Sequence, residues 1–243
     1  MIEVRALRAE DRASVGAIFA ATHLLGEPLP FVLDGADRYT RFALDWYLTE
    51  GSADGAVAVD GSGTVVGYCL VCCAPARHRR WLARRTSRLA AGVIGDIVWG
   101  RIGPHSRRYY RARLRDAVRL GVSRHGSGGA AHAHVNVLPG LRDGSVARRL
   151  RDHVDERCRR AGIDAWYGEV NARLGRRVAG LERVGGSVID RQPNHTFSAL
   201  LGEPIVRLTM LRRVPPRPNQ PPATAGMIDT VAPSGTGVSR PWR

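Results

Sequence analysis

Lysine is absent from this chain. All 37 basic residues are arginine, and with 22 acidic residues they give a formal net charge of +15. Because arginine is enriched along the whole sequence, we interpret most of it as a solvated cationic surface rather than one binding patch. A charge of this size still attracts polyanions and acidic partners.

Cysteine is scarce, and its spacing does not indicate a metal site. Cys69, Cys72 and Cys73 lie in or next to an apolar run, and Cys158 lies in a basic segment. No second Cys/His pair follows at zinc spacing. We expect buried thiols, no bound metal and a reducing compartment.

Long hydrophobic runs are also missing. The most apolar segment, Leu89–Trp99, is interrupted by Asp96 and is far shorter than the roughly 20 residues that span a bilayer. No apolar leader region follows the N-terminal residues. We therefore expect a cytoplasmic protein.

Proline is concentrated at the C-terminus. Half of the 14 prolines fall in residues 215–243, among Gly, Ser and Thr and without an apolar stripe. A segment of this composition cannot bury enough surface to order itself. We expect one folded domain over residues 1–214 and a disordered tail over 215–243.

The most structured pattern lies in residues 131–186. Residues 132–138 alternate with a period of two, which predicts a strand with His132, His134 and Asn136 on one face. Apolar residues then recur every four positions from Val146 to Cys158, which predicts an amphipathic helix. A second strand follows at 165–170, so the segment predicts a parallel β–α–β unit.

Charged residues fill the rest of this helix. Asp155 stands four positions from both Arg151 and Arg159. Such i,i+4 pairs support a helix by roughly 0.2–0.5 kcal/mol each, so we expect Asp155 to pair along the helix surface.

The turn between the first strand and the helix predicts an anion site. Gly140 and Gly144 make it flexible, and Ser145 begins the helical pattern. Unpaired backbone N–H groups and the helix dipole both favour a phosphate at such a position.

Residues 142–147, with the sequence RDGSVA, resemble the coenzyme A pyrophosphate loop of GNAT-type N-acyltransferases. The pattern of that loop is Q/R-x-x-G-x-G/A before an amphipathic helix. Arg142 and Ala147 match its ends, whereas Ser145 stands at the middle glycine and Gly144 is displaced by one position. A serine there could still present its N–H and add a hydroxyl donor.

Other segments resemble the same family in the same order. Residues 1–22 are similar to its opening strand and helix, and 55–75 to its central hairpin, with a turn at 60–63. Residues 169–173 resemble the segment after the second strand of its splayed pair, and residues 183–186 resemble the helix end that precedes its last two strands. The resemblance covers residues 1–75 and 131–214.

The resemblance implies an α/β fold. Its central sheet would be mixed but mostly antiparallel, with about six to seven strands flanked by helices and splayed at the cofactor site. It also implies an N-acetyltransferase that transfers an acetyl or other acyl group from acetyl-CoA to the amine of a small molecule or a peptide.

The resemblance also assigns binding residues. The backbone N–H of Val137 or Leu138 would polarise the thioester carbonyl, and Asn171 would contact the pantetheine arm. The pyrophosphate would be bound by the loop residues Arg142, Asp143, Gly144, Ser145, Val146 and Ala147.

Glu169 and His134, ahead of His132, are our candidates for the general base that deprotonates the attacking ammonium. Each lies where the two parallel strands would part. For each a structural role is the alternative, since Glu169 can pair with an arginine and His134 can be a hydrogen-bonded strand residue.

One position argues against catalysis. Many family members carry a tyrosine four residues before the late glycine, where it protonates the leaving thiolate. Counting back from Gly185 gives Leu181, which cannot donate a proton, and Tyr167 is a possible substitute. The alternatives are therefore a non-catalytic acyl-CoA-binding protein and, supported only by charge, a nucleic-acid-binding protein.

An arginine-rich segment at residues 76–127 lies outside the resemblance. Its apolar spacing predicts two helices, the first through Trp81 and Leu89 and the second through Tyr109 and Leu114. Three interpretations remain open: a flap over the acceptor site, an amphipathic surface that contacts membrane or nucleic acid, or a structural insertion. The sequence does not identify the acceptor.

Overall fold

The computed structural model describes residues 2–122, 129–141, 144–173 and 186–216, and it contains a seven-stranded mixed sheet. The strand order is β1-β2-β3-β4-β5-β7-β6. The bounds of the strands are β1 Glu3–Ala6, β2 Ala56–Val59, β3 Val65–Cys72, β4 Ala131–Val137, β5 Ala165–Arg173, β6 Ser187–Pro193 and β7 Ile205–Arg213. Among the strands that the structure describes, only β4 and β5 pair in parallel. The expected α/β fold and strand number are confirmed.

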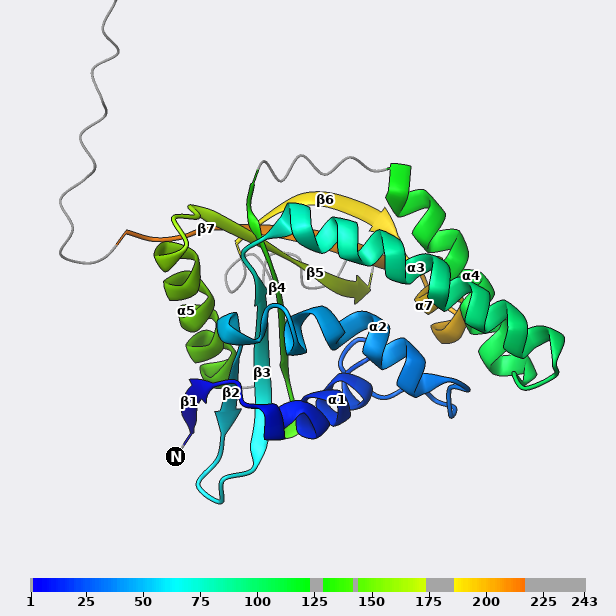
Figure 1. The fold of residues 1–243 in the computed structure, drawn as a ribbon, viewed down its shortest axis with the longest axis horizontal. Coiled ribbons are helices and arrows are strands. Elements are labelled where there is room, and N and C mark those ends of the chain that lie inside the picture. Colours follow the sequence, from blue (N-terminus) through cyan, green and yellow to red (C-terminus); the bar gives the residue numbers. More distant parts are fainter. Residues whose placement is uncertain (1, 123–128, 142–143, 174–185, 217–243) are drawn as a thin grey trace, which may run out of the picture.

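Helices cover both faces of this sheet (Figure 1). Their bounds are α1 Arg12–Ala21, α2 Ala36–Leu48, α3 Pro75–Val98, α4 Pro104–Val122, α5 Ser145–Arg160 and α7 His195–Leu201. Helix α5 lies on one side of the sheet, and α1, α2 and the α3–α4 pair lie on the other. The two helices expected within residues 76–127 are present as α3 and α4.

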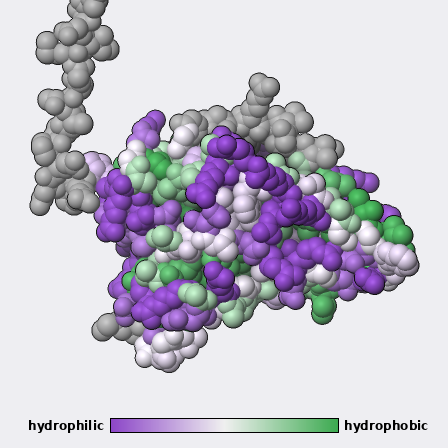
Figure 2. All heavy atoms as spheres, in the orientation of Figure 1, coloured by the Kyte–Doolittle hydropathy of each residue, from purple (hydrophilic) through white to green (hydrophobic). Residues whose placement is uncertain are grey.

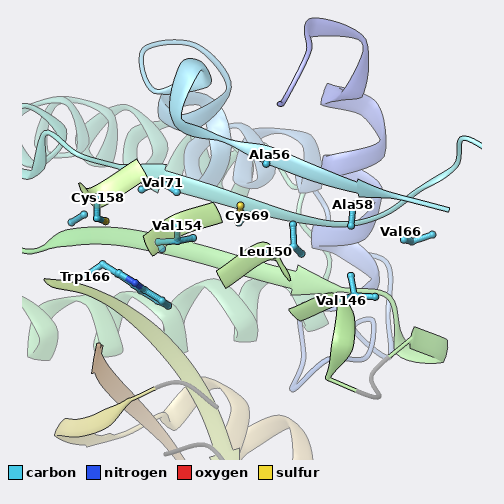
Figure 3. Close-up of a cluster of buried hydrophobic side chains, with 12 residues drawn as sticks. Ala56, Ala58, Val66, Cys69, Val71, Val146, Leu150, Val154, Cys158 and Trp166 are labelled. Carbon is cyan, nitrogen blue, oxygen red and sulfur yellow. The ribbon is translucent and has the colours of Figure 1, made fainter. Parts of the chain in front are cut away.

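Helix α5 packs on the centre of the sheet through the predicted stripe. Val146, Leu150, Val154 and Cys158 are all buried and face β2 and β3, where Cys69 joins the same core (Figure 3). Burial of such side chains contributes roughly 1.5–3 kcal/mol each. The stripe thereby fixes the N-terminus of α5 beside the end of β4.

Asp155 does not lie on the helix surface, contrary to our expectation. It is buried, and its carboxylate accepts hydrogen bonds from Trp166 Nε1 at 2.7 Å and from Arg212 Nη2 at 2.9 Å. Position 155 follows Val154 on the apolar face, so it points towards β5 and β7 and pairs across the layer. This contact joins α5 to both strands.

The α3–α4 hairpin belongs to the same folded unit. Tyr109 and Tyr110 of α4 are buried in a cluster with Tyr39 of α2 and Phe197 of α7. At the start of α7, the Asp116 carboxylate accepts hydrogen bonds from two backbone N–H groups and a hydroxyl, those of His195 N, Thr196 N and Thr196 Oγ1. Helix α4 is thus held against the end of the sheet that contains β5 and β7.

The surface is mostly hydrophilic over α3 and α5, as Figure 2 shows. Apolar side chains gather at the end of the α3–α4 hairpin, where Ile94, Val98 and Trp99 are exposed. None of the described helices is both long enough and apolar enough to cross a membrane. The tail beyond residue 216 lies outside the described residues.

We expect Asp155→Ala to destabilise the protein by about 3 kcal/mol, because it leaves the Trp166 N–H and the Arg212 guanidinium without their buried partner. The melting temperature measured by circular dichroism should fall by roughly 6–12 °C. The control is Asp152→Ala on the same helix, whose side chain is 61% exposed and whose loss should cost under about 0.5 kcal/mol. Equal effects of the two substitutions would contradict the role assigned to Asp155.

Candidate active site in the gap between two strands

Strands β4 and β5 part soon after they begin. The ladder between them consists of Ala131↔Trp166 and His132↔Tyr167. Strand β5 then pairs with β7 along all nine of its residues, whereas β4 stays with β3. The C-terminal half of β4 therefore has an unpaired edge that faces the gap.

Hydrogen bonding on the other edge identifies which N–H groups face this gap. The N–H of Leu138 donates to the carbonyl of Val66 at 3.0 Å, towards β3. Backbone groups alternate along a strand, so the N–H groups of Val135 and Val137 point to the opposite side, into the gap. Of the two predicted positions, Val137 has an N–H open to a ligand, and Leu138 does not.

A cavity of about 640 Å³ passes through the sheet at this gap. Its lining on the α5 side comes from Val135, Val137, Ala147, Val170 and Ala172. On the opposite side the lining includes Phe19, His23, Tyr39, Arg113, His134, Asn136, Glu169, Asn171, Phe197 and Arg207. The cavity thus has one mouth at the start of α5 and a second lobe among α1, α2, α4 and α7.

The start of α5 forms the first mouth. Gly144 is the N-cap, with a φ of 89° that favours glycine, and its carbonyl accepts the N–H of Arg148. Ala147 lines the cavity, Ser145 is exposed beside it, and Val146 is buried under the helix. The remaining loop residues of the prediction, Arg142 and Asp143, lie outside the described residues.

The two candidate bases line the same cavity. Glu169 is 38% exposed, and its Oε2 lies 3.8 Å from Arg207 Nη1, so the arginine pairing considered from the sequence is present but loose. His134 is half-buried, and its ring meets those of Tyr47 and His132 edge-on. Desolvation lowers the pKa of His134, against the opposing effect of Glu169, so its ring is neutral at pH 7.

Asn171 also reaches the cavity, but part of its side chain is already used. Its Oδ1 accepts a hydrogen bond from Asn194 Nδ2 at 2.8 Å, and Asn194 caps α7. This bond orients the Asn171 amide, so that its Nδ2 is the group left for a ligand.

Other sequence candidates lie away from the cavity. His132 is buried behind His134, where its Nδ1 is 2.6 Å from the Tyr47 hydroxyl. Tyr167 packs on His132 with ring centroids 4.7 Å apart, and it is not among the cavity-lining residues. Leu181 lies outside the described residues.

Several lining residues were not found from the sequence. Phe19, His23, Tyr39, Arg113 and Phe197 come from four helices and the turn after α1, and they meet only in the folded chain. The periodic aromatics of α2, Tyr39 and Tyr47, were the available signal for a buried helix face. Nothing in the sequence distinguishes Arg113 from the arginines around it.

A second, open hollow lies between α4 and α7, away from the predicted residues. Its volume is about 920 Å³, and Arg107, Arg108, Arg111 and Arg115 line it with His195. None of the predicted site residues is in this hollow.

Four buried or half-buried histidines make the stability of the protein dependent on pH. Desolvation, aided by Arg113, lowers the pKa of His23 to about 4. Desolvation, aided by His134, lowers that of His78 to about 4, and burial also lowers the pKa values of His132 and His134. Between the ordinary value near 6.5 and the lowered values, the unfolded chain binds protons that the folded chain does not.

We therefore expect stability to fall as the pH drops from 7 to 5, by roughly 5 °C or more in melting temperature. The variant His23→Phe keeps an aromatic ring in its pocket and removes one of the titrating groups. Its melting temperature should fall less steeply over the same pH range. A curve as steep as that of the unmodified protein would contradict the neutral, buried state of His23.

Solved structures similar to this chain include acetyltransferases. A Drosophila melanogaster polyamine N-acetyltransferase matches with a TM-score of 0.53 and 17% identity, over 88% of this chain and 100% of its own. An agmatine N-acetyltransferase matches with a TM-score of 0.53 and 18% identity, over 87% and 99%. A GCN5-related N-acetyltransferase from Kribbella flavida matches with a TM-score of 0.52 and 17% identity, over 87% and 97%.

No family model matches the sequence, and no curated protein matches it. At these identities the structural likeness establishes the fold. The chain has the fold of the GNAT acetyltransferases, as its sequence predicted.

Proposed function

We propose that this protein is an N-acetyltransferase that transfers an acetyl group from acetyl-CoA to an amine. The observation that carries the proposal is the cavity through the sheet, with a helix N-terminus at one mouth and Glu169 in its opposite lobe. A thioester that enters from the α5 side would meet an amine that enters from the other side.

The α5 mouth suits the pyrophosphate of the donor. Backbone N–H groups in the first turn of a 16-residue helix carry the positive end of its dipole. Ala147 leaves space there for a close approach. Arg142 and Asp143 complete the proposed loop, from which Arg142 adds positive charge.

The open edge of β4 suits the extended pantetheine arm. Backbone groups of Val135 and Val137 face the gap and can pair with amide groups of the arm, as an added strand would. We assign polarisation of the thioester carbonyl to the Val137 N–H, since the Leu138 N–H is bonded to Val66. Asn171 would contact the arm from β5 through its Nδ2.

Glu169 is our candidate for the general base, with His134 as the second candidate. The base takes one proton from the ammonium, and the neutral amine then attacks the carbonyl carbon. A C–N bond forms, the C–S bond breaks, and the thiolate leaves with the electron pair. The nitrogen then loses its second proton to the thiolate or to water, which leaves a neutral amide. The partial exposure of Glu169 to the cavity and its loose pairing with Arg207 favour it over the more enclosed His134.

We expect Ala147→Glu to abolish acetyl-CoA binding, measured by calorimetry, because it places a carboxylate where the pyrophosphate would lie. The fold should survive, since an acidic residue is favourable in the first turn of a helix. The control is Ala83→Glu on an exposed position of α3. Unchanged affinity in Ala147→Glu would mean that the phosphate site lies elsewhere.

We expect Glu169→Gln to lower kcat for thiol release about 10²- to 10⁴-fold, because an amide cannot accept the proton. Its affinity for acetyl-CoA should stay within about twofold. The matched control is Glu50→Gln, which is exposed and pairs with Arg77. A rate retained in Glu169→Gln but lost in His134→Gln would move the role to His134.

If the protein binds acetyl-CoA but releases no free coenzyme A in the presence of any amine, the alternative is favoured, a non-catalytic acyl-CoA-binding protein. Leu181 at the position of the family's tyrosine supports that alternative.

A further inference from the structure

Arg113 is a cation enclosed beside the lobe of the cavity away from α5. It comes from α4, its Nη2 donates to the Tyr39 hydroxyl at 2.8 Å, and its Cζ lies 5.8 Å from the centroid of the Tyr39 ring. Within the described part of the chain, no carboxylate forms an ion pair with Arg113. A desolvated cation without a counter-ion is costly for a fold to maintain.

The acidic residue on the same helix, Asp116, is hydrogen-bonded to α7 rather than to Arg113. Its two carboxylate oxygens accept hydrogen bonds from the first residues of α7, including the Thr196 hydroxyl at 2.6 Å. Asp116 therefore fixes α4 to α7 and leaves the guanidinium of Arg113 available to the cavity.

Arg207 adds a second cation to the same lobe. Its side chain is only 12% exposed, and Nη1 lies 3.8 Å from Glu169, which is longer than a hydrogen bond. Arg207 stands opposite Asn171 on β7, so it lies beside the proposed base. Arg173 also lines the cavity, but it pairs with Glu203 at 2.6 Å. Arg113 and Arg207 against the single carboxylate of Glu169 therefore leave this lobe with an excess of positive charge.

From this excess we propose that the acceptor is an amino acid, whose carboxylate is bound by Arg113 and Arg207 while its amine meets Glu169. The inference rests on the proposed function. Phe19, Tyr39 and Phe197 form the apolar walls of the lobe and fit an apolar or aromatic side chain. Arginine is suited to the task because its planar fork matches a carboxylate.

The same charges disfavour acceptors with two positive groups. A diamine or a guanidino-amine in this lobe would bring its second cation towards Arg113 or Arg207. Two of the similar structures are an agmatine and a polyamine acetyltransferase. The shared fold therefore does not carry their substrates over to this chain.

The test compares acceptors that differ only in the carboxylate: phenylalanine with phenethylamine, tyrosine with tyramine, and methionine with 3-(methylthio)propylamine. Thiol release with acetyl-CoA gives kcat/KM for each member. We expect the amino acid to be preferred at least about 10-fold in each pair where transfer occurs. Spermidine and agmatine should be poorer acceptors than any of the amino acids.

Variants of α4 connect the preference to one residue. In Arg113→Gln, kcat/KM for the amino acid should fall close to that for its amine partner in each pair, mainly because KM for the amino acid rises. Arg113→Lys should keep part of the preference for the amino acid. Arg111→Gln, exposed on the same helix, is the matched control and should keep all of it. If Arg113→Gln does not fold, Arg113→Lys and the comparison within the unmodified protein still decide.

A binding measurement separates this inference from the proposed function. Calorimetry with N-acetylphenylalanine and N-acetylphenethylamine needs no catalysis, and we expect the first to bind at least about 10-fold more tightly. Selective binding without thiol release would uphold the carboxylate site and reject the transferase. Equal binding, or equal kcat/KM in every pair, would overturn the carboxylate site and leave the transferase standing.

Discussion

The parting of β4 and β5 is the constraint on which the rest of the site depends. A parallel pair that continued would satisfy the backbone groups of both strands and close the sheet. Here the ladder between β4 and β5 ends at His132 and Tyr167, and β5 pairs with β7 along its full length. The N–H of Val137 then faces the cavity and is not used by the pairing with β3. An extended ligand along β4 would supply a partner for it.

The packing around the gap holds it open. Helix α5 is fixed to β2 and β3 by its apolar stripe and to β5 and β7 through Asp155, which bonds Trp166 and Arg212. On the other face, two hydrogen-bonded contacts hold α4 in place. Asp34 of the α1–α2 connection accepts the N–H of Gly103 just before α4, and Asp116 of α4 accepts the N–H of Thr196 at the start of α7. The cavity is therefore bounded by elements that are each anchored elsewhere in the fold.

The arginine-rich α3–α4 hairpin contributes a charged residue to the cavity. Helix α4 supplies Arg113 and thereby adds a positive charge to the lining of the cavity between β4 and β5. Of the three interpretations that the sequence left open for residues 76–127, the flap over the acceptor site is the one that the position of Arg113 supports. The exposed residues Val98 and Trp99 at the tip of the hairpin do not line this cavity.

Local patterns in the sequence predicted much of the fold. Alternation predicted β4, and the four-residue apolar period predicted α5. The hairpin of β2 and β3 was expected from the resemblance of residues 55–75 to the family's central hairpin. These signals work because each element buries one face against a single layer. Glu169 and His134 were correctly expected on strands that part, whereas Asn171 was expected after the end of the second strand and lies within β5. The structure brings all three to one cavity.

What the sequence could not supply depends on contacts between distant segments. Asp155 looked like a surface partner of Arg151, and only the packing of α5 on β5 turns it inward. The difference between Val137 and Leu138 depends on which edge of β4 pairs with β3. Arg113 is placed beside the cavity only because α4 packs against α2, where its guanidinium donates to the Tyr39 hydroxyl. One arginine among 37 carries no local mark of such a role.

The most direct test of the account is a crystal structure of the protein with coenzyme A. The account predicts that the pantetheine arm lies in the gap along Val135 and Val137, with the pyrophosphate at the first turn of α5 beside Ala147. Coenzyme A bound elsewhere, for example against the arginines of the hollow between α4 and α7, would contradict it. In that case the parting of β4 and β5 would be a property of the fold without the function that we propose for it.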